Sequence, residues 1–258
     1  LPPTLFGWRD PGSGFTAVIQ LGTIAAVLLY FWRDLLQTAR EWTRSLAGGD
    51  RQALGARVGW AILIGSIPIV IAGLLLEKQI DATFRTAWIV GGALIFFGLL
   101  MGVAEKVGQH ARPYEQVSLK DGLWMGLWQC LALIPGSSRS GSTITGGLFG
   151  GLERAAAARL SFLLSVPAVL GSGVYKLYKE RSELLGAGLT PTVVATLAAF
   201  VSGWFAIDFL MKFLRERSTW LFVWYRVALG ILVLGLAFMG AIPATPPMMS
   251  DVPTQTAP

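Results

Sequence analysis

Six apolar runs dominate this sequence, each long enough or nearly long enough to cross a lipid bilayer. A transmembrane helix needs about 20 predominantly apolar residues. Hydrophobic residues make up 53% of the chain and charged residues only 14%, against about 25% charged in soluble domains. The sequence therefore predicts an all-α polytopic membrane protein rather than a soluble enzyme. Its expected spans are 15–32, 58–76, 86–104, 160–178, 189–207 and 219–242.

A further apolar stretch, 123–152, does not fit this pattern. Its arms, 123–135 and 141–152, are too short to span, and the polar turn Gly-Ser-Ser-Arg-Ser separates them at 136–140. Two short arms around a polar turn predict a re-entrant helix-loop-helix that enters the membrane and returns to the same side. Irregular backbone at that depth must be packed in protein or line a wet cavity.

The basic residues of the loops predict an orientation. With the hairpin returning to its own side, 13 Lys and Arg fall on one face and 6 on the other. The positive-inside rule places the richer face in the cytoplasm. We expect residues 1–242 to form one integral membrane domain, and the Pro-rich tail 243–258 to lie outside the cell and to be disordered.

The net charge of +6 and pI near 9.8 do not indicate a nucleic-acid partner, because the mean hydropathy is +0.59 and a nucleic-acid footprint needs its basic residues gathered on a solvated face. The single cysteine, Cys130, excludes an internal disulfide framework. The expected surroundings are the lipid bilayer, with a homodimer left open.

Three crossings in each half of the chain predict an inverted repeat, which places binding sites near the bilayer midplane. The hairpin of the second half should then have a partner in the first half. The sequence begins at Leu1, directly before the first span. We therefore expect an N-terminal re-entrant hairpin to be missing from it.

Arg139 is the only charged residue between Asp121 and Glu153. A charge within an apolar stretch is expensive and usually faces a partner or a cavity. Glycines, serines and a threonine surround it in 135–143, and the arm after it would direct its N-terminal amides to the same place. Because guanidinium matches phosphate oxygens, this pattern predicts a membrane-buried phosphate site. The alternative is a solvated Ser/Gly loop with a stray arginine.

The stretch Pro-Gly-Ser-Ser-Arg-Ser-Gly-Ser-Thr at 135–143 resembles the PGxSRSxxT signature of the undecaprenyl-diphosphate phosphatase family, which is linked to bacitracin resistance. Residues 15–23, 129–134 and 161–167 resemble family sequence in the same order. The resemblance implies a hydrolase of the bacterial cell (inner) membrane with six spans and two re-entrant hairpins. It would cleave undecaprenyl diphosphate to the monophosphate and inorganic phosphate, recycling the lipid carrier of peptidoglycan synthesis.

Carried over by position, the resemblance implies that Arg139 clamps the diphosphate and Gly136 forms a tight turn. The hydroxyls expected around Arg139 are those of Ser138, Ser140 and Thr143. Further diphosphate contacts are expected from Ser137, Gly141, Ser142 and Gln129. Both a serine and a water remain open as the nucleophile.

The chain departs from the family pattern at its other motif, a Glu-x-x-x-Glu helix followed by a Ser-Ser-Thr-Gly-His loop. Here the first glutamate is Glu41 and the only histidine is His110, in a loop. The resemblance implies a divalent metal, Mg²⁺ or Ca²⁺, whose ligands we expect in the missing segment, with no metal site in this chain. We accordingly expect the 258-residue chain alone to be inactive.

Two other functions remain open: a polyprenyl-phosphate transporter or flippase, because inverted repeats around a midplane anion site suit transport, and an inactive remnant. Hydrolysis needs a group that activates the nucleophile or binds metal, whereas transport needs only the clamp. In the last span, Arg226 is expected to snorkel or to contact a phospholipid. Gly91, Gly92, Gly98 and Gly102 are expected to be close helix-packing positions.

Overall fold

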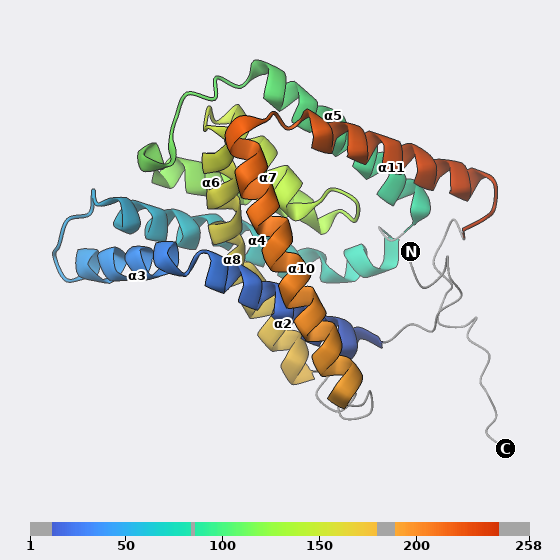
Figure 1. The fold of residues 1–258 in the computed structure, drawn as a ribbon, viewed down its shortest axis with the longest axis horizontal. Coiled ribbons are helices and arrows are strands. Elements are labelled where there is room, and N and C mark those ends of the chain that lie inside the picture. The colour runs from blue at the N-terminus through green and yellow to red at the C-terminus, as the bar shows by residue number, and fades with distance from the viewer. Residues whose placement is uncertain (1–11, 84–85, 180–188, 243–258) are drawn as a thin grey trace.

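The computed structural model describes residues 12–83, 86–179 and 189–242, which form helices joined by short loops (Figure 1). The tail 243–258, predicted to be disordered, lies outside the described residues. The longer helices are α2 (Gly12–Tyr30), α3 (Trp32–Leu46), α4 (Leu54–Thr83), α5 (Ala87–Val107), α6 (Leu119–Cys130), α7 (Arg139–Phe149), α8 (Arg154–Lys179), α10 (Leu189–Glu216) and α11 (Trp220–Phe238), with short 3-10 turns at Tyr114–Gln116 and Leu131–Leu133.

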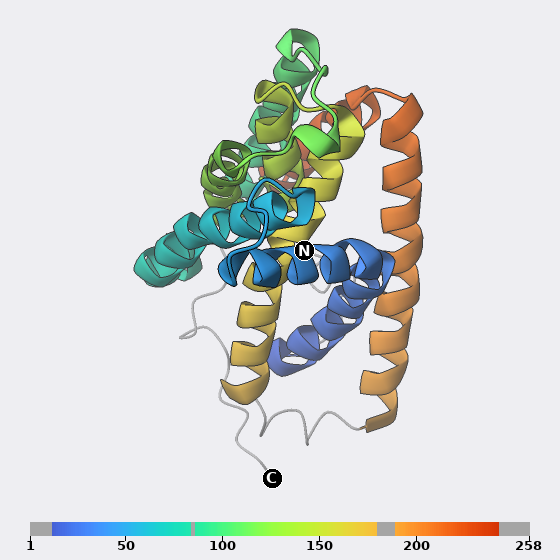
Figure 2. The same cartoon turned by 90° about the vertical axis from the view of Figure 1, so that its left-hand side faces the viewer.

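The helices pack in pairs around the short central helix α7. Helix α5 lies along α11, α2 along α10, and α4 contacts both α3 and α6. Helix α7 packs on α5, α6 and α8. Figure 2 shows α10 running along one side of the molecule. This arrangement brings the polar turn before α7 next to elements from both halves of the chain.

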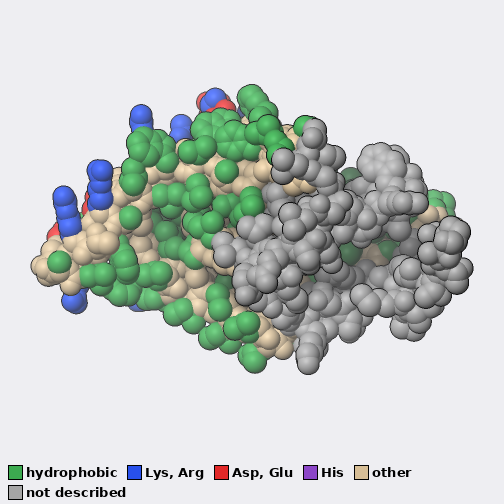
Figure 3. Space-filling view, turned by 90° about the horizontal axis from the view of Figure 1, so that it is seen from below, with side chains coloured by type: hydrophobic (Ala, Val, Ile, Leu, Met, Phe, Trp, Pro, Cys, Tyr) green, Lys and Arg blue, Asp and Glu red, His purple; other side chains and the backbone are tan. Residues whose placement is uncertain are grey.

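Five described helical segments are long and apolar enough to cross a membrane: Leu54–Leu76, Ala87–Val107, Arg154–Gly171, Thr192–Glu216 and Trp220–Phe238. They correspond to five of the six predicted spans, and α2 contributes a shorter apolar stretch, Gln20–Tyr30. Large hydrophobic side chains cover much of the outer surface, and basic ones project where α3 lies (Figure 3). The chain is thus a multi-pass membrane protein, and its six-span inverted repeat stays a prediction.

The first predicted span, 15–32, is shorter in the structure. Helix α2 ends at Tyr30, the chain bends at Phe31 (φ −99°, ψ 20°), and α3 starts at Trp32. Helix α3 is amphipathic because it carries charged residues such as Arg33 and Arg40 on the side away from its neighbours. A change of direction therefore falls where the apolar run meets the first charges.

The predicted hairpin forms two short helices, α6 and α7, that pack against each other. Helix α6 starts at Leu119, before the predicted 123, because Ser118 and Asp121 form a capping box. Helix α7 starts at Arg139 because Ser138 caps it by accepting a hydrogen bond from the Gly141 amide (3.3 Å). At 12 and 11 residues, both are too short to span a bilayer.

Glycines let α6 approach α4 to backbone contact. A Cβ on Gly126 would lie 2.2 Å from the Gly65 carbonyl oxygen, and one on Gly122 would lie 2.4 Å from that of Ala61. No larger residue fits these positions without moving a helix. In lipid no hydrophobic force drives two helices together, and small residues at such crossings allow the close van der Waals packing that does.

The glycines predicted to mediate packing in α5 do so at three positions of four. Cβ atoms on Gly91, Gly98 and Gly102 would meet α11 at 2.7, 3.2 and 3.2 Å, respectively. Gly92 has nothing within 4 Å of its Cβ position, so the packing prediction was wrong there. Only one side of α5 faces α11, and Gly92 lies on another.

Candidate functional site

The turn between the hairpin helices has a backbone that few residues adopt. Gly136 has φ +93°, and a Cβ there would lie 2.5 Å from the Val90 carbonyl oxygen. Ser138 has φ +63°, a sparsely populated region for a residue with a side chain, and such strain clusters at functional sites. The turn brings the first backbone amides of α7, which have no intrahelical acceptor, beside the chain of 136–138.

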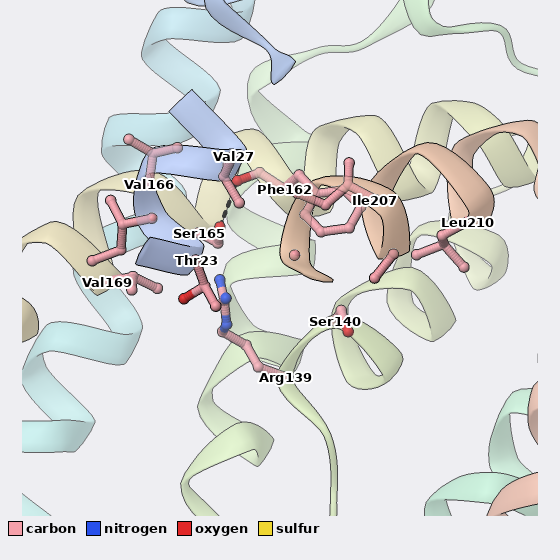
Figure 4. Close-up of a pocket in the computed structure, with 13 residues that line it drawn as sticks. Thr23, Val27, Arg139, Ser140, Phe162, Ser165, Val166, Val169, Ile207 and Leu210 are labelled. Atoms are coloured by element: carbon pink, nitrogen blue, oxygen red, sulfur yellow. Dashed lines mark hydrogen bonds between the residues drawn. The ribbon is translucent and has the colours of Figure 1, made fainter. Parts of the chain in front are cut away.

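Arg139 faces a cavity of about 320 Å³ between α2, α7, α8 and α10, which we call the Arg139 cavity. Figure 4 shows its guanidinium directed toward Thr23 of α2 and Ser165 of α8. No described residue makes a hydrogen bond or an ion pair with this guanidinium. The remaining wall is mostly apolar: Ile24, Val27, Phe162, Val166, Val169, Ile207 and Leu210.

An unpaired cation between hydroxyls and an apolar wall suits an amphiphilic anion. The guanidinium can bind oxyanions, and the wall can receive the hydrocarbon next to them. Fixed donors of this kind also stabilise charge that develops on a transferring phosphoryl group. The Arg139 cavity can therefore bind and orient a lipid phosphate or diphosphate.

A second cavity, of about 430 Å³, lies between α5, α7, α10 and α11, and we call it the Arg226 cavity. It shares Ser140 and Leu210 with the first. Arg226 reaches the hairpin turn from α11: its Nη2 donates to the carbonyl oxygens of Gly136 (3.2 Å) and Ser137. With 4% of its surface exposed, Arg226 does not snorkel to the membrane surface.

That correction has a physical reason. Arg226 lies near the start of α11, where an arginine that faces lipid would extend toward water. The sequence does not reveal which face of α11 is turned inward, and the turn of α7 offers carbonyl oxygens at hydrogen-bonding distance. Gly98 of α5 lies opposite Arg226, with its Cβ position 3.2 Å from the Arg226 Cβ, so the inward direction of Arg226 follows from the packing of α5 on α11.

The structure places the nine predicted site residues in three groups. Arg139 and Ser140 line the Arg139 cavity, and Ser140 also lines the Arg226 cavity. Three others line the Arg226 cavity only: Gly136, Ser138 and Gly141. The remaining four are buried and line neither: Ser137, Ser142, Thr143 and Gln129.

The buried group supports the turn. Thr143 donates to the Arg139 carbonyl oxygen (2.9 Å) and shares a hydrogen bond with Ser161 of α8. Ser142 donates to the Ser137 carbonyl oxygen (3.4 Å). Gln129 is 0% exposed and its amide atoms have no partner among the described residues. Their roles toward a substrate stay predictions.

Arg112 fastens both ends of the hairpin. Its Nη1 donates to Asp121 (2.8 Å) at the start of α6 and to the Gly150 carbonyl oxygen (2.9 Å) at the end of α7. The hydroxyl and amide of Ser118 also donate to Asp121. Burial raises the pKa of Asp121, but the hydrogen bonds from Arg112 and Ser118 outweigh it and leave the pKa below its usual value.

The residues around the two cavities do not fit the divalent metal that the family resemblance implies. Mg²⁺ and Ca²⁺ are held by carboxylate and carbonyl oxygens. The described linings of both cavities hold arginines and hydroxyls but no carboxylate, and the described residues contain no group of three acidic, histidine or cysteine side chains suited to a metal. The participation of a metal therefore stays a prediction.

Most of the chain matches a known protein family. The family described as bacitracin resistance protein BacA matches residues 1–232. The chain belongs to this family. The match contains both cavities and every residue of the 135–143 signature, so the BacA family resemblance that the signature carried is confirmed.

Curated relatives extend over almost the whole chain. An undecaprenyl-diphosphatase of Renibacterium salmoninarum is 50% identical over 246 residues, which cover 93% of this chain and 88% of the relative. One of Myxococcus xanthus is 48% identical over 247 residues (94% and 82%), and one of Chloroherpeton thalassium is 46% identical over 254 residues (94% and 89%).

Proposed function

We propose that this BacA family protein is a membrane hydrolase that converts undecaprenyl diphosphate to undecaprenyl phosphate and inorganic phosphate. The observation that carries the proposal is the Arg139 guanidinium, which has no partner among the described residues and faces a cavity with hydroxyls on one side and an apolar wall on the other. The relatives named undecaprenyl-diphosphatase support the same substrate. The activity would return the lipid carrier to peptidoglycan synthesis and raise resistance to bacitracin.

In this reaction Arg139 binds the diphosphate and balances the negative charge that grows on the transferring phosphoryl group. Thr143 and Ser161 hold the start of α7 on α8, and Arg226 holds the turn through two carbonyl oxygens. The reactive phosphoryl group thus meets donors that are already in place. Whether a serine or a water attacks it stays open, as does the divalent metal.

The proposal includes a location and an orientation. The protein would lie in the bacterial inner membrane with its basic loops in the cytoplasm, its C-terminus outside and its hairpin re-entrant. Cysteines introduced singly at Arg40 and Arg217, which lie in exposed positions of two basic segments, test this orientation. A membrane-impermeant maleimide should label both in inverted vesicles and neither in intact cells, and the reverse pattern would contradict it.

The activity is tested with the purified chain in neutral detergent, by binding of radiolabelled undecaprenyl diphosphate and by release of inorganic phosphate with Mg²⁺ or Ca²⁺ present. Arg139→Lys keeps the charge but loses the planar fork. It should weaken binding, and it should lower phosphate release by about 100-fold, in the range of one lost transition-state donor. Arg217→Lys, at an exposed arginine, is the matched control.

Turnover that depends on Arg139 supports the proposal and contradicts the expectation that this chain alone is inactive. Arg139-dependent binding without turnover would favour a transporter or an inactive remnant. Equal binding and hydrolysis by Arg139→Lys and Arg217→Lys would remove Arg139 from the mechanism.

A further inference from the structure

The Arg226 cavity has the donors of an anion site, and its charged side chain is Arg226 rather than Arg139. Besides Arg226, its polar lining comes from the hairpin turn and the start of α11, whereas most of its other wall is apolar. The polar lining residues are Gly136, Ser138, Ser140, Gly141, Thr219 and Tyr225.

Arg226 is only partly satisfied by the protein. Its Nη2 donates to two turn carbonyls, but Nε and Nη1 are enclosed and have no hydrogen-bond partner among the described residues. A buried, charged donor without a partner is costly, because it has lost its water without gaining an acceptor. An acceptor that enters the cavity would remove that cost.

The start of α7 adds donors at the same place. Nη1 of Arg226 lies against Gly141, where a Cβ would be 2.4 Å from it. Gly141 is the third residue of α7, so the guanidinium sits over the first turn, whose amides and dipole favour an anion. A helix N-terminus and an unpaired buried arginine therefore converge from two different elements.

The carboxylate of Glu105, which bonds the lining residue Thr219, is already paired with an arginine. Glu105 of α5 accepts from Thr219 Oγ1 (2.9 Å), but it is also paired with Arg154 through Nε (2.8 Å) and Nη2 (2.6 Å). The described lining residues themselves include no carboxylate. The cavity is thus positively charged overall and has room for a small anion.

We propose that the Arg226 cavity is a second phosphate site, distinct from the Arg139 cavity, that takes a phosphate dianion. The proposal rests on the proposed function in one respect: hydrolysis beside Ser140, which lines both cavities, would generate inorganic phosphate next to it. The same chemistry is offered by the headgroup of a phosphomonoester lipid. Bound phosphate would accept from Nε or Nη1 of Arg226 and from the amides at the start of α7.

The test is binding of radiolabelled orthophosphate to the full chain in neutral detergent, measured by equilibrium dialysis. Arg139→Gln removes the cation of the first cavity and should leave at least one saturable site with an affinity within twofold of the wild type. Arg226→Lys can still donate to the turn carbonyls but lacks the Nε and Nη1 donors, and should weaken this site at least tenfold. Arg217→Lys is the control at an exposed arginine.

A second variant tests the same site independently, in case Arg226→Lys misfolds. Gly141→Ala places a methyl group where Nη1 lies, so it displaces the guanidinium without removing its charge, and it should also weaken phosphate binding. The thermal unfolding midpoint of each variant is measured, and its phosphate binding is expressed per mole of folded protein. Loss of binding in Arg139→Gln, with binding retained in both Arg226→Lys and Gly141→Ala, would overturn the proposal.

A second arm separates the two sources of phosphate. The chain is placed in phosphatidylcholine nanodiscs with or without dioleoyl phosphatidate, and orthophosphate binding is measured again. Competition by phosphatidate assigns the site to a lipid headgroup, and its absence assigns the site to free phosphate; either result supports a phosphate site that depends on Arg226. No saturable binding of either would overturn it. Because phosphate binding needs no turnover, the binding result can be interpreted even if the protein does not hydrolyse the diphosphate.

Discussion

Replacement of Gly126 by alanine tests whether the position of the hairpin turn depends on the contact between α6 and α4. The added Cβ would lie 2.2 Å from the Gly65 carbonyl oxygen, and ordinary contact begins at about 3.4 Å. Because backbone lies on both sides, α6 must move outward by about 1.2 Å, the difference of these distances. Helix α6 leads through Leu131–Leu133 directly to the turn that ends at Arg139.

Two magnitudes follow from that shift. Overpacking costs about 1–3 kcal/mol, of which the higher helix propensity of alanine offsets about 1 kcal/mol. The net loss of about 0–2 kcal/mol in unfolding free energy should lower the thermal midpoint by at most about 8 °C, at about 2–4 °C per kcal/mol. A misplacement of about 1 Å at a reacting centre lowers the rate by about 100-fold. Activity should therefore fall much further than stability.

The measurements are hydrolysis of undecaprenyl diphosphate and thermal unfolding, both in neutral detergent. Gly92→Ala is the matched control, because it makes the same change within a helix at a position with nothing within 4 Å, and it should keep wild-type activity. Hydrolysis by Gly126→Ala within twofold of that control would refute the link between the α4–α6 contact and the turn.

Three further substitutions test other supports of the site. Asp121→Asn should lower the free energy of unfolding by about 3 kcal/mol at neutral pH, because it breaks the ion pair between Arg112 and the 8% exposed Asp121 side chain. This value is the lower end of the range for a broken buried pair. The pKa of Asp121 is depressed in the folded protein, so the extra stability of the wild type over Asp121→Asn should be full above about pH 4 and should vanish as the pH falls through that folded pKa. Equal unfolding midpoints of the two proteins at pH 7 would contradict this. Glu105→Ala should cost about 3–5 kcal/mol, since its carboxylate, 4% exposed, pairs with Arg154; a double-mutant cycle with Arg154→Ala that proves additive would exclude the coupling. Thr143→Val should cost about 1–2 kcal/mol through its lost hydrogen bonds, and an unchanged midpoint would show that Thr143 does not anchor α7.

Hydropathy predicted the spans because lipid imposes a length on any helix that crosses it, and five described segments match. The short arms around Arg139 likewise predicted two short helices, since neither arm could span. Helix ends were less predictable: α6 begins at Leu119 because Ser118 and Asp121 cap it, a local hydrogen-bonding effect that hydropathy does not register. The break at Phe31 was missed because Trp32 continues the apolar run.

The sequence predicted those residues of the candidate site that lie together in one continuous segment. Arg139 and Ser140 stood out because a charge and hydroxyls interrupt an apolar stretch, and both line a cavity. The snorkelling expected of Arg226 was wrong because its contact with Ser137 joins residues 89 apart in the sequence, which no local pattern reveals. Its contact with a phospholipid stays a prediction. Similarly, Thr143 resembles any other hydroxyl of the signature, and only the packing of α7 on α8 turns it toward Ser161.

The two arginines of the site share an electrostatic consequence. Arg226 donates to carbonyl oxygens, and Arg139 has no partner in the described residues, so within that part of the structure neither charge is neutralised by a carboxylate. The protein therefore carries the desolvation energy of the buried Arg226 and of the partly buried Arg139. An anion that binds them offsets part of it, so phosphate-bearing ligands should raise the unfolding temperature more than their size suggests. Occupancy by phosphate-bearing ligands would then be a determinant of the lifetime of the protein in the membrane.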